Sequence, residues 1–121
     1  MGRIVHQVNI ESALQSKEVL ELDALVNTGA SLLTLPMHYK EYFQSLIYEE
    51  AECVTASEIT TTTIGGPVKI TLHGYRSVFG EIAFLKGLDE PLIGYSILEI
   101  IPVAVDMLGH RLVPVKYLDM K

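Results

Sequence analysis

The residues of this sequence best suited to chemistry form one short polar loop between two apolar stretches. The loop follows the apolar residues 24–26 and precedes the largely apolar residues 32–36. Small polar side chains at the mouth of two buried strands are a common way to present reactive groups from a rigid base. The pattern therefore predicts a functional loop, which consists of Asn27, Thr28, Gly29, Ala30 and Ser31.

The elements around this loop are predicted to be strands. Residues 4–10 alternate between apolar and polar, which is typical of a half-buried strand. Residues 19–26 predict a second strand that leads into the loop, and residues 31–35 a third that ends at Pro36. The polar residues 11–18 predict a turn or an exposed hairpin connection.

The middle of the chain is less uniform. The spacing of apolar residues in Met37–Glu50 favours a short helix, and its aromatic residues are expected to pack in the core. We interpret the acidic residues that follow as a solvated loop. The residues behind the helix prediction are Tyr39, Tyr42, Phe43, Leu46 and Ile47, and the acidic residues are Glu49, Glu50 and Glu52.

From Val54 onward the composition favours strands again. Residues 60–64, 68–72 and 77–85 are rich in β-branched and apolar residues, with Gly65-Gly66-Pro67 as a bulge or bend. A short helix is expected at Tyr95–Ile101, before a final hairpin that joins residues 103–106 to 111–115. Many short strands with one or two short helices predict a single all-β domain over residues 1–121, a small closed β-barrel.

The loop resembles the active-site loop of the retropepsin-like aspartic proteases, whose pattern is apolar-apolar-Asp-Thr-Gly-Ala-Ser. Leu25 and Val26 match the apolar pair, and residues 28–31 match Thr-Gly-Ala-Ser. Asn27 stands where the family has its catalytic Asp. Farther along, Leu92-Ile93-Gly94 resembles the apolar-apolar-Gly element that packs behind the family's loop. The region from Pro91 to Pro114 is especially similar to the small prokaryotic members.

The resemblance implies a symmetric homodimer with a peptide or protein substrate and no cofactor. Because the chain carries one such loop, two identical subunits would have to complete an active site. In that arrangement Thr28 makes a hydrogen bond across the dimer, Gly29 lets backbone approach the peptide, and Ser31 bonds to residue 27. The expected dimer seam uses Arg3–Ile10 and Val113–Leu118.

The family also has a flap, a hairpin that closes over bound peptide. By its order along the chain we expect the flap between Val54 and Thr62, with Gly65-Gly66 as an alternative tip. The favoured tip consists of Ala56, Ser57, Glu58 and Ile59. Substrate side chains would then contact Ala30, Ser31 and pockets lined by Leu25, Ile59, Ile64 and Ile93.

Asn27 changes the expected chemistry. Aspartic proteases use two carboxylates that share one proton to activate a water. An amide has no charge and no titratable proton in the useful range, so an Asn pair cannot act as a general base. We therefore expect a catalytically inactive chain. We favour a deliberate inactivating substitution, because the surrounding residues still fit the catalytic pattern; the alternative is a natural non-catalytic homologue that binds peptides or acts as a scaffold.

Composition excludes several other classes of function. Hydrophobic residues make up 49% of the 121 residues, and the net charge is −6, which disfavours nucleic acid and anionic membrane surfaces as partners. No apolar run is long enough to span a membrane. The single Cys53 cannot form an internal disulfide, which fits a cytoplasmic protein. No metal site is expected, because the four histidines are far apart: His6, His38, His73 and His110.

Overall fold

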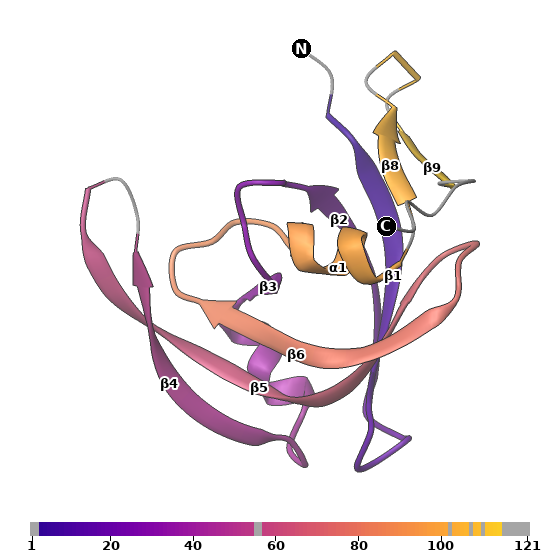
Figure 1. Ribbon diagram of the computed structural model, residues 1–121. Helices are drawn as coiled ribbons and strands as arrows, with labels where there is room; N and C mark the ends of the chain where they lie inside the picture. The colour runs from indigo at the N-terminus through magenta and orange to yellow at the C-terminus, as the bar shows by residue number, and fades with distance from the viewer. Residues whose placement is uncertain (1–2, 55–56, 102, 107, 110, 115–121) are drawn as a thin grey trace, which may run out of the picture.

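The computed structural model describes residues 3–54, 57–101, 103–106, 108–109 and 111–114. Within these ranges the protein is mostly β, with one mixed seven-stranded sheet, one two-stranded sheet and two short helices (Figure 1). The prediction of a β-rich chain with a short helix near its C-terminal end is confirmed. The strands are β1 (Val5–Ser12), β2 (Val19–Val26), β3 (Leu33–Pro36), β4 (Ile47–Val54), β5 (Ile59–Leu72), β6 (Ser77–Leu85), β7 (Leu92–Ile93), β8 (Val103–Asp106) and β9 (Arg111–Pro114), and the helices are the 3-10 helix η1 (Met37–Tyr42) and the α-helix α1 (Tyr95–Ile100).

The N-terminal hairpin forms where apolar and polar residues alternate. β1 and β2 pair antiparallel, from Val5 opposite Leu25 to Glu11 opposite Val19. β1 also pairs with β5 along its other edge, from Val8 to Ser12. The expected dimer seam at Arg3–Ile10 is therefore only partly open, because residues 8–10 are paired on both sides within the chain. Residues 115–118 of the expected seam lie outside the described residues.

The main sheet curls until its strands meet. Its order is β1-β2-β7-β3-β6-β5-β4, and the extra β1–β5 pairing joins six of these strands in a ring. The ring has its fewest paired residues at β7, which pairs with β2 at two positions and with β3 at one. β4 lies outside the ring, at the end of the sheet. The sheet is therefore mixed and irregular rather than the regular closed barrel that we predicted.

β5 is one long strand that belongs to two hairpins. Residues 59–66 of β5 pair with β4, residues 63–65 and 68–71 pair with β6, and the register with β6 shifts between Gly65 and Val68. The glycines therefore lie inside a paired strand at a bulge, as the favoured interpretation required, and not at a hairpin tip. The predicted hairpin of residues 68–72 with 77–85 is confirmed.

The predicted helix over Met37–Glu50 is wrong beyond its first turns. η1 ends at Tyr42, and β4 begins at Ile47, so the acidic residues lie on a strand and not in a loop. Phe43 and Leu46 are buried as expected, but Ile47 is 72% exposed and Tyr42 is 50% exposed. The apparent helical spacing arose because Phe43 and Leu46, which are buried in the η1–β4 connection, are three positions apart.

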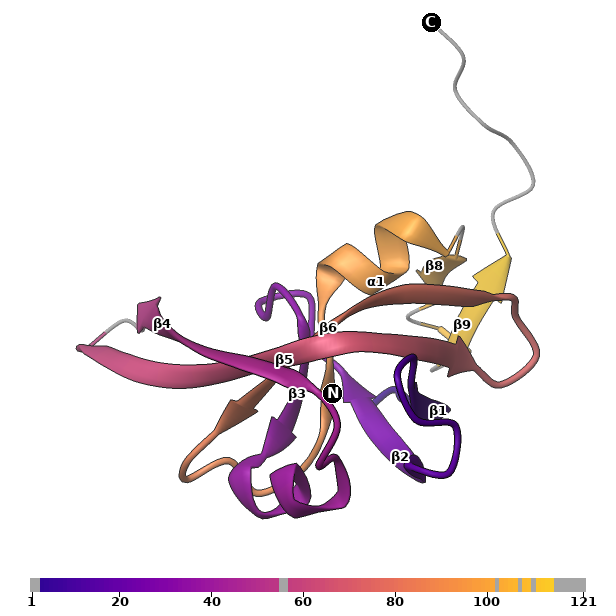
Figure 2. The ribbon, with the colours of Figure 1, turned by 90° about the horizontal axis from the view of Figure 1, so that it is seen from below.

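The core fills the space inside the ring. Its largest fully buried side chains include Phe43, Phe84, Ile82 and Leu35. α1 and the β8–β9 hairpin confirm the predicted C-terminal elements, and Ile97 and Ile101 reach the core from the helix side. Seen from below, α1 lies on the opposite side of the β5–β6 strands from η1 (Figure 2). Among the helices described, none has the length and apolar character needed to cross a membrane.

Candidate functional site

The loop between β2 and β3 is closed by its own hydrogen bonds. The Asn27 side-chain oxygen Oδ1 accepts a bond of 2.9 Å from the Gly29 N–H. The Asn27 carbonyl accepts a second bond, of 3.1 Å, from the Ala30 N–H. Side chains of Asn and Asp commonly close turns in this way. Asn27 is thereby fixed in its loop, and its backbone N–H also donates to the Ile93 carbonyl at 3.0 Å.

Gly94 supports the loop from behind by close backbone contact. A Cβ atom at Gly94 would lie 2.5 Å from the Leu32 carbonyl oxygen and 2.8 Å from the Ala30 carbonyl oxygen. The first residues of α1 then bond to the loop: the Tyr95 N–H donates to Ala30 at 2.9 Å and the Ser96 N–H donates to Ser31 at 3.2 Å. The apolar-apolar-Gly segment does pack behind the loop, as predicted, because only glycine permits this approach.

The loop presents its polar residues outward. Thr28, Gly29 and Ser31 are exposed, while Asn27 and Ala30 are half-buried. Within the described part of the chain, the Thr28 hydroxyl makes no hydrogen bond. Among the same residues no bond joins the Ser31 side chain to residue 27: Asn27 Oδ1 accepts from the Gly29 N–H, and the Ser31 carbonyl accepts from the Ser96 hydroxyl.

A cavity of about 360 Å³ lies between this loop and the β4–β5 hairpin. The loop contributes residues 29–32, the hairpin contributes residues from both of its strands, and β3, β6 and β7 close the base. The hairpin turns between Val54 and Ile59, which pair with each other. The hairpin expected as a flap is therefore present, with Ser57 and Glu58 in its turn, while Ala56 lies outside the described residues.

Several predicted site residues line this cavity and others do not. Gly29, Ala30, Ser31 and Ile64 line it as predicted. Asn27, Leu25, Ser57, Glu58 and Ile59 are not among its lining residues.

The prediction that Ile93 lines a substrate pocket is wrong, because its side chain is fully buried. Neighbouring residues of a strand point to opposite faces, so Leu92 reaches the cavity and Ile93 packs in the core. Ile59 lies at the hairpin tip, 67% exposed and outside the cavity lining.

Sequence reasoning missed most of the cavity wall opposite the loop. β4 supplies Glu52, Cys53 and Val54, and these were hidden because β4 itself was not predicted. The sequence of β4 carries no clear alternation of apolar and polar residues, because three of its eight residues are glutamates. The remaining missed lining residues are Leu32, Thr34, Thr62, Ala83, Leu85, Leu92 and Tyr95.

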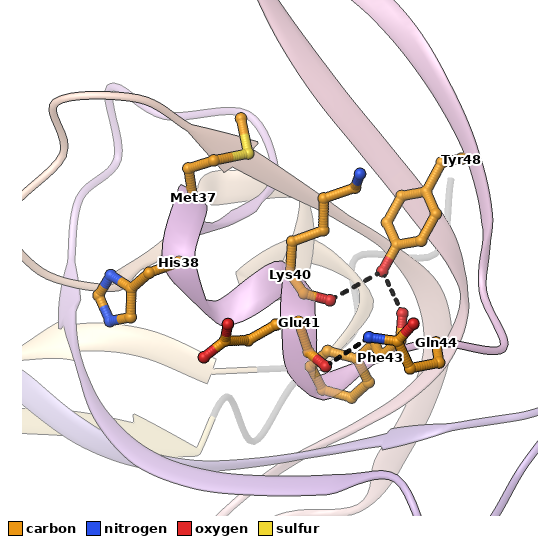
Figure 3. Close-up of a pocket in the computed structure, with 7 residues that line it drawn as sticks. All are labelled: Met37, His38, Lys40, Glu41, Phe43, Gln44 and Tyr48. Atoms are coloured by element: carbon orange, nitrogen blue, oxygen red, sulfur yellow. Dashed lines mark hydrogen bonds between the residues drawn. The ribbon is translucent and has the colours of Figure 1, made fainter.

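A larger hollow, of about 490 Å³, lies between η1 and β4 (Figure 3). The Tyr48 hydroxyl there donates to the Phe43 carbonyl at 2.6 Å, and Lys40 Nζ lies 4.7 Å from the centre of the Tyr48 ring. Burial, with a smaller effect of the Glu18 carboxylate, raises the pKa of the Tyr48 hydroxyl above its ordinary value. The polar groups of this hollow bond to backbone or face solvent, so they form no catalytic set. Its lining is Met37, His38, Lys40, Glu41, Phe43, Gln44 and Tyr48.

No cluster of three or more His, Cys, Asp or Glu side chains that could hold a metal ion occurs in the part of the chain that the structure describes. Comparison with known proteins gave no family: no family model matches the chain, and no curated protein matches it significantly. The loop, its support by Gly94 and the adjacent cavity are therefore the observations on which a function can be argued.

Proposed function

We propose that this chain is a retropepsin-like domain that binds an extended peptide between the Asn27–Ser31 loop and the β4–β5 hairpin. The observation that carries this proposal is the cavity of about 360 Å³ with an outward-facing polar loop on one wall and a hairpin on the other. A peptide lying there in an extended form can bond by its backbone to the hairpin strands. Its side chains can enter the largely apolar part formed by Leu32, Ile64 and Leu92.

The proposed site is completed by a second, identical subunit. One chain carries one Asn27 loop, and hydrolysis by a carboxylate pair needs two such loops facing each other. The exposed Thr28 hydroxyl has no hydrogen-bond partner among the described residues, which fits a bond across the subunit boundary. Since Thr28 and Gly29 are both exposed at the apex of the loop, nothing in the described chain covers the surface that would meet the second loop.

The proposed chemistry is peptide hydrolysis, and Asn27 suspends it. With Asp at this position, one carboxylate would take a proton from water while the other, protonated, would polarise the scissile carbonyl. The Asn27 amide can do neither, so the chain as given should hold a peptide without cutting it. The loop does not need a carboxylate to form, since the Asn27 amide oxygen already accepts the Gly29 N–H.

The hydrogen bond from the Gly29 N–H to the Asn27 amide oxygen also favours a second candidate function, a peptide-binding or scaffold module without chemistry. The Asn27 amide closes the turn and leaves the cavity open, so binding does not depend on catalysis. The two candidates share the same cleft and the same dimer. They differ only in whether restoring the carboxylate restores hydrolysis.

The deciding experiment compares the chain as given with Asn27→Asp and Asn27→Ala. Cleavage of an unfolded protein substrate is measured from about pH 3 to about pH 8, with and without a peptide inhibitor that mimics the transition state. We expect inhibitor-sensitive cleavage by Asn27→Asp alone. Activity should be greatest in the acidic range, because one carboxyl of the pair must stay protonated.

Sedimentation velocity at micromolar concentration and inhibitor binding by the Asn27 chain accompany the cleavage assay. A folded, dimeric Asn27→Asp variant that binds inhibitor and does not cleave would establish the binding module instead. A monomer that binds no inhibitor would overturn both candidates, because the composite cleft would not exist.

A further inference from the structure

We infer that the outer edge of β4 is a second peptide-binding site, which adds a basic extended segment as a new strand of the sheet. β4 is the last strand of the seven-stranded order, and its only pairing partner in the described chain is β5. Its outer edge therefore presents the backbone N–H and C=O groups of an eight-residue strand. Such an edge is a template for another strand.

The charge on this edge selects the occupant. Glu49, Glu50 and Glu52 are all exposed on β4, which carries no Lys or Arg. Within the described residues none of the three forms an ion pair. Opposite charges on neighbouring strands stabilise their pairing, and like charges directly opposite destabilise it. A segment with Lys or Arg at several positions is therefore the complementary strand.

The same charges disfavour a second copy of this chain at the edge. Two antiparallel β4 strands would bring three glutamates of one chain beside three glutamates of the other. Charged edges are a known means of preventing a protein from pairing with itself. The structure thus combines an open edge with a barrier to self-association, and the barrier does not act on a basic partner.

Two hollows border the first residues of β4, and Tyr48 lines both of them. The hollow of about 490 Å³ lies on the face of the Tyr48 ring, beside η1. A hollow of about 360 Å³ lies beside Ile47 and Glu49, with Pro67 and Glu81 on its other side. The second hollow extends from Ile47 toward Pro67 on β5 and Glu81 on β6, so a long side chain of an added strand would have to cross Ile47 to reach it.

The hollow beside Ile47 fits a long basic side chain in detail. Ile47 is 72% exposed and Pro67 is also exposed, which gives an apolar floor for the methylene groups of Lys or Arg. Glu49 and Glu81 at its border supply carboxylates for the charged end. This hollow shares no lining residue with the proposed cleft, whose lining on β4 begins at Glu52.

The test uses an eight-residue peptide that repeats Lys-Lys-Val-Val, with both ends blocked, matched to the length of β4 and carrying Lys on both faces of the added strand. Its binding to the full chain is measured by fluorescence anisotropy. Two versions carry N-methyl groups on alternate backbone amides, one set on the odd amides and the other on the even amides. An added strand donates hydrogen bonds from one edge only, so one version should lose about tenfold in affinity and the other should bind nearly as the parent does. Equal binding by both would overturn the proposal, because general charge attraction needs no particular edge.

Charge-matched variants locate the site on the protein. The double variant Glu49→Lys, Glu50→Lys leaves Glu52 of the cleft wall unchanged and should weaken the parent peptide by about tenfold. The control Asp23→Lys, Asp89→Lys makes the same change in net charge at exposed positions away from β4, and it should retain binding. If both double variants lose binding equally, the site is not on β4.

The amide spectrum of the wild-type chain separates this inference from the proposed function. On adding the Lys-Val peptide, ¹⁵N shifts should change along residues 47–52 and around η1. Changes confined to the loop and to the hairpin residues that line the cleft, with residues 47–50 unchanged, would place the peptide in the cleft and overturn the edge site, while leaving the proposed function standing. Changes on β4 that follow the concentration of the protein itself, without peptide, would show that a second copy is the occupant.

Discussion

The two walls of the cavity are built in different ways. On one side the Asn27–Ser31 loop is held by contacts between backbones, with Gly94 so close that a Cβ would lie 2.5 Å from Leu32. On the other side the β4–β5 hairpin is held mainly by the pairing of its two strands, and it extends away from the body in both views (Figures 1 and 2). Its paired tip residues Val54 and Ile59 are 75% and 67% exposed.

This difference shows which wall can adapt to a ligand. The loop backbone contacts the backbone at Gly94 directly, with no side chain between them. The loop therefore cannot shift without losing hydrogen bonds, and it forms the rigid wall of the cavity. A hairpin with few buried contacts near its tip opens at lower free energy than the body of the protein. A binding site made of a fixed base and an adaptable cover fits peptides of varied sequence, and the predictions below test that contrast.

The largest effect is expected from Gly94→Ala. The Cβ would overlap the Leu32 and Ala30 carbonyl oxygens, which belong to backbone and cannot move aside. We expect a loss of about 3 kcal/mol in the free energy of unfolding, measured by urea titration, together with loss of inhibitor binding. The backbone at Gly94 is extended, so the cost is steric and not conformational.

Gly80→Ala is the matched control, because the nearest atom to its Cβ would be the Ile70 Cδ1 at 3.8 Å. Its unfolding free energy should stay within about 1 kcal/mol of the parent value. Similar losses for the two variants would mean that the loop wall is no more tightly packed than an ordinary strand.

A second, smaller effect is expected at the tip of the hairpin. The double variant Val54→Ser, Ile59→Ser removes two exposed apolar side chains, so the unfolding free energy should change by only about 0.5 kcal/mol. If the hairpin covers bound peptide, the same change should weaken inhibitor binding by about tenfold. Unchanged affinity, measured by isothermal titration, would show that the tip does not cover the ligand.

Tyr48→Phe tests the base of the hairpin. The Tyr48 hydroxyl donates to the Phe43 carbonyl at 2.6 Å and so joins β4 to the η1–β4 connection. Removing this hydroxyl should lower the free energy of unfolding by about 1 kcal/mol, measured by thermal unfolding. Tyr42→Phe is the control, because Tyr42 is 50% exposed and its hydroxyl makes no bond in the described chain, and it should melt as the parent does.

The smallest expected effect is a pH-dependent change in stability near the base of the β4–β5 hairpin, where Glu18 contacts Ser45. The Glu18 carboxylate accepts from the Ser45 hydroxyl at 2.6 Å and from the Ser45 N–H at 3.0 Å, and these bonds lower the pKa of Glu18 below its ordinary value. A lowered folded-state pKa stabilises the protein above the unfolded-state pKa of about 4.3, and this contribution disappears as the pH falls through the folded-state pKa.

Glu18→Gln should therefore be less stable than the parent at about pH 7, with the difference shrinking at about pH 3. Urea unfolding at the two pH values measures the difference. Glu99→Gln, the same substitution at an exposed position on α1, is the control. A difference for Glu18→Gln that stays constant with pH would contradict the role of its charge.

Local patterns were sufficient for much of the fold. β2 and β6 were predicted at their observed bounds, and for β6 the signal was the alternation of apolar and polar residues, because one face of the strand packs on the core. The helix at Tyr95 and the bulge at Gly65-Gly66 were also predicted from residues close in sequence. The packing of the Gly94 element behind the loop was expected from the resemblance to the retropepsin-like proteases, and the absence of a Cβ at Gly94 is what allows the close backbone contact.

Tertiary structure alone decided the cavity wall opposite the loop. β4 is an acidic strand that pairs on one side only, so it does not carry the apolar alternation of a strand with a buried face. Leu92 and not Ile93 reaches the cavity, because the short β7 strand lies between β2 and β3 and this placement determines which face of it is buried. Which residues share a cavity depends on strands distant in sequence being brought side by side, and no pattern within one strand encodes that pairing.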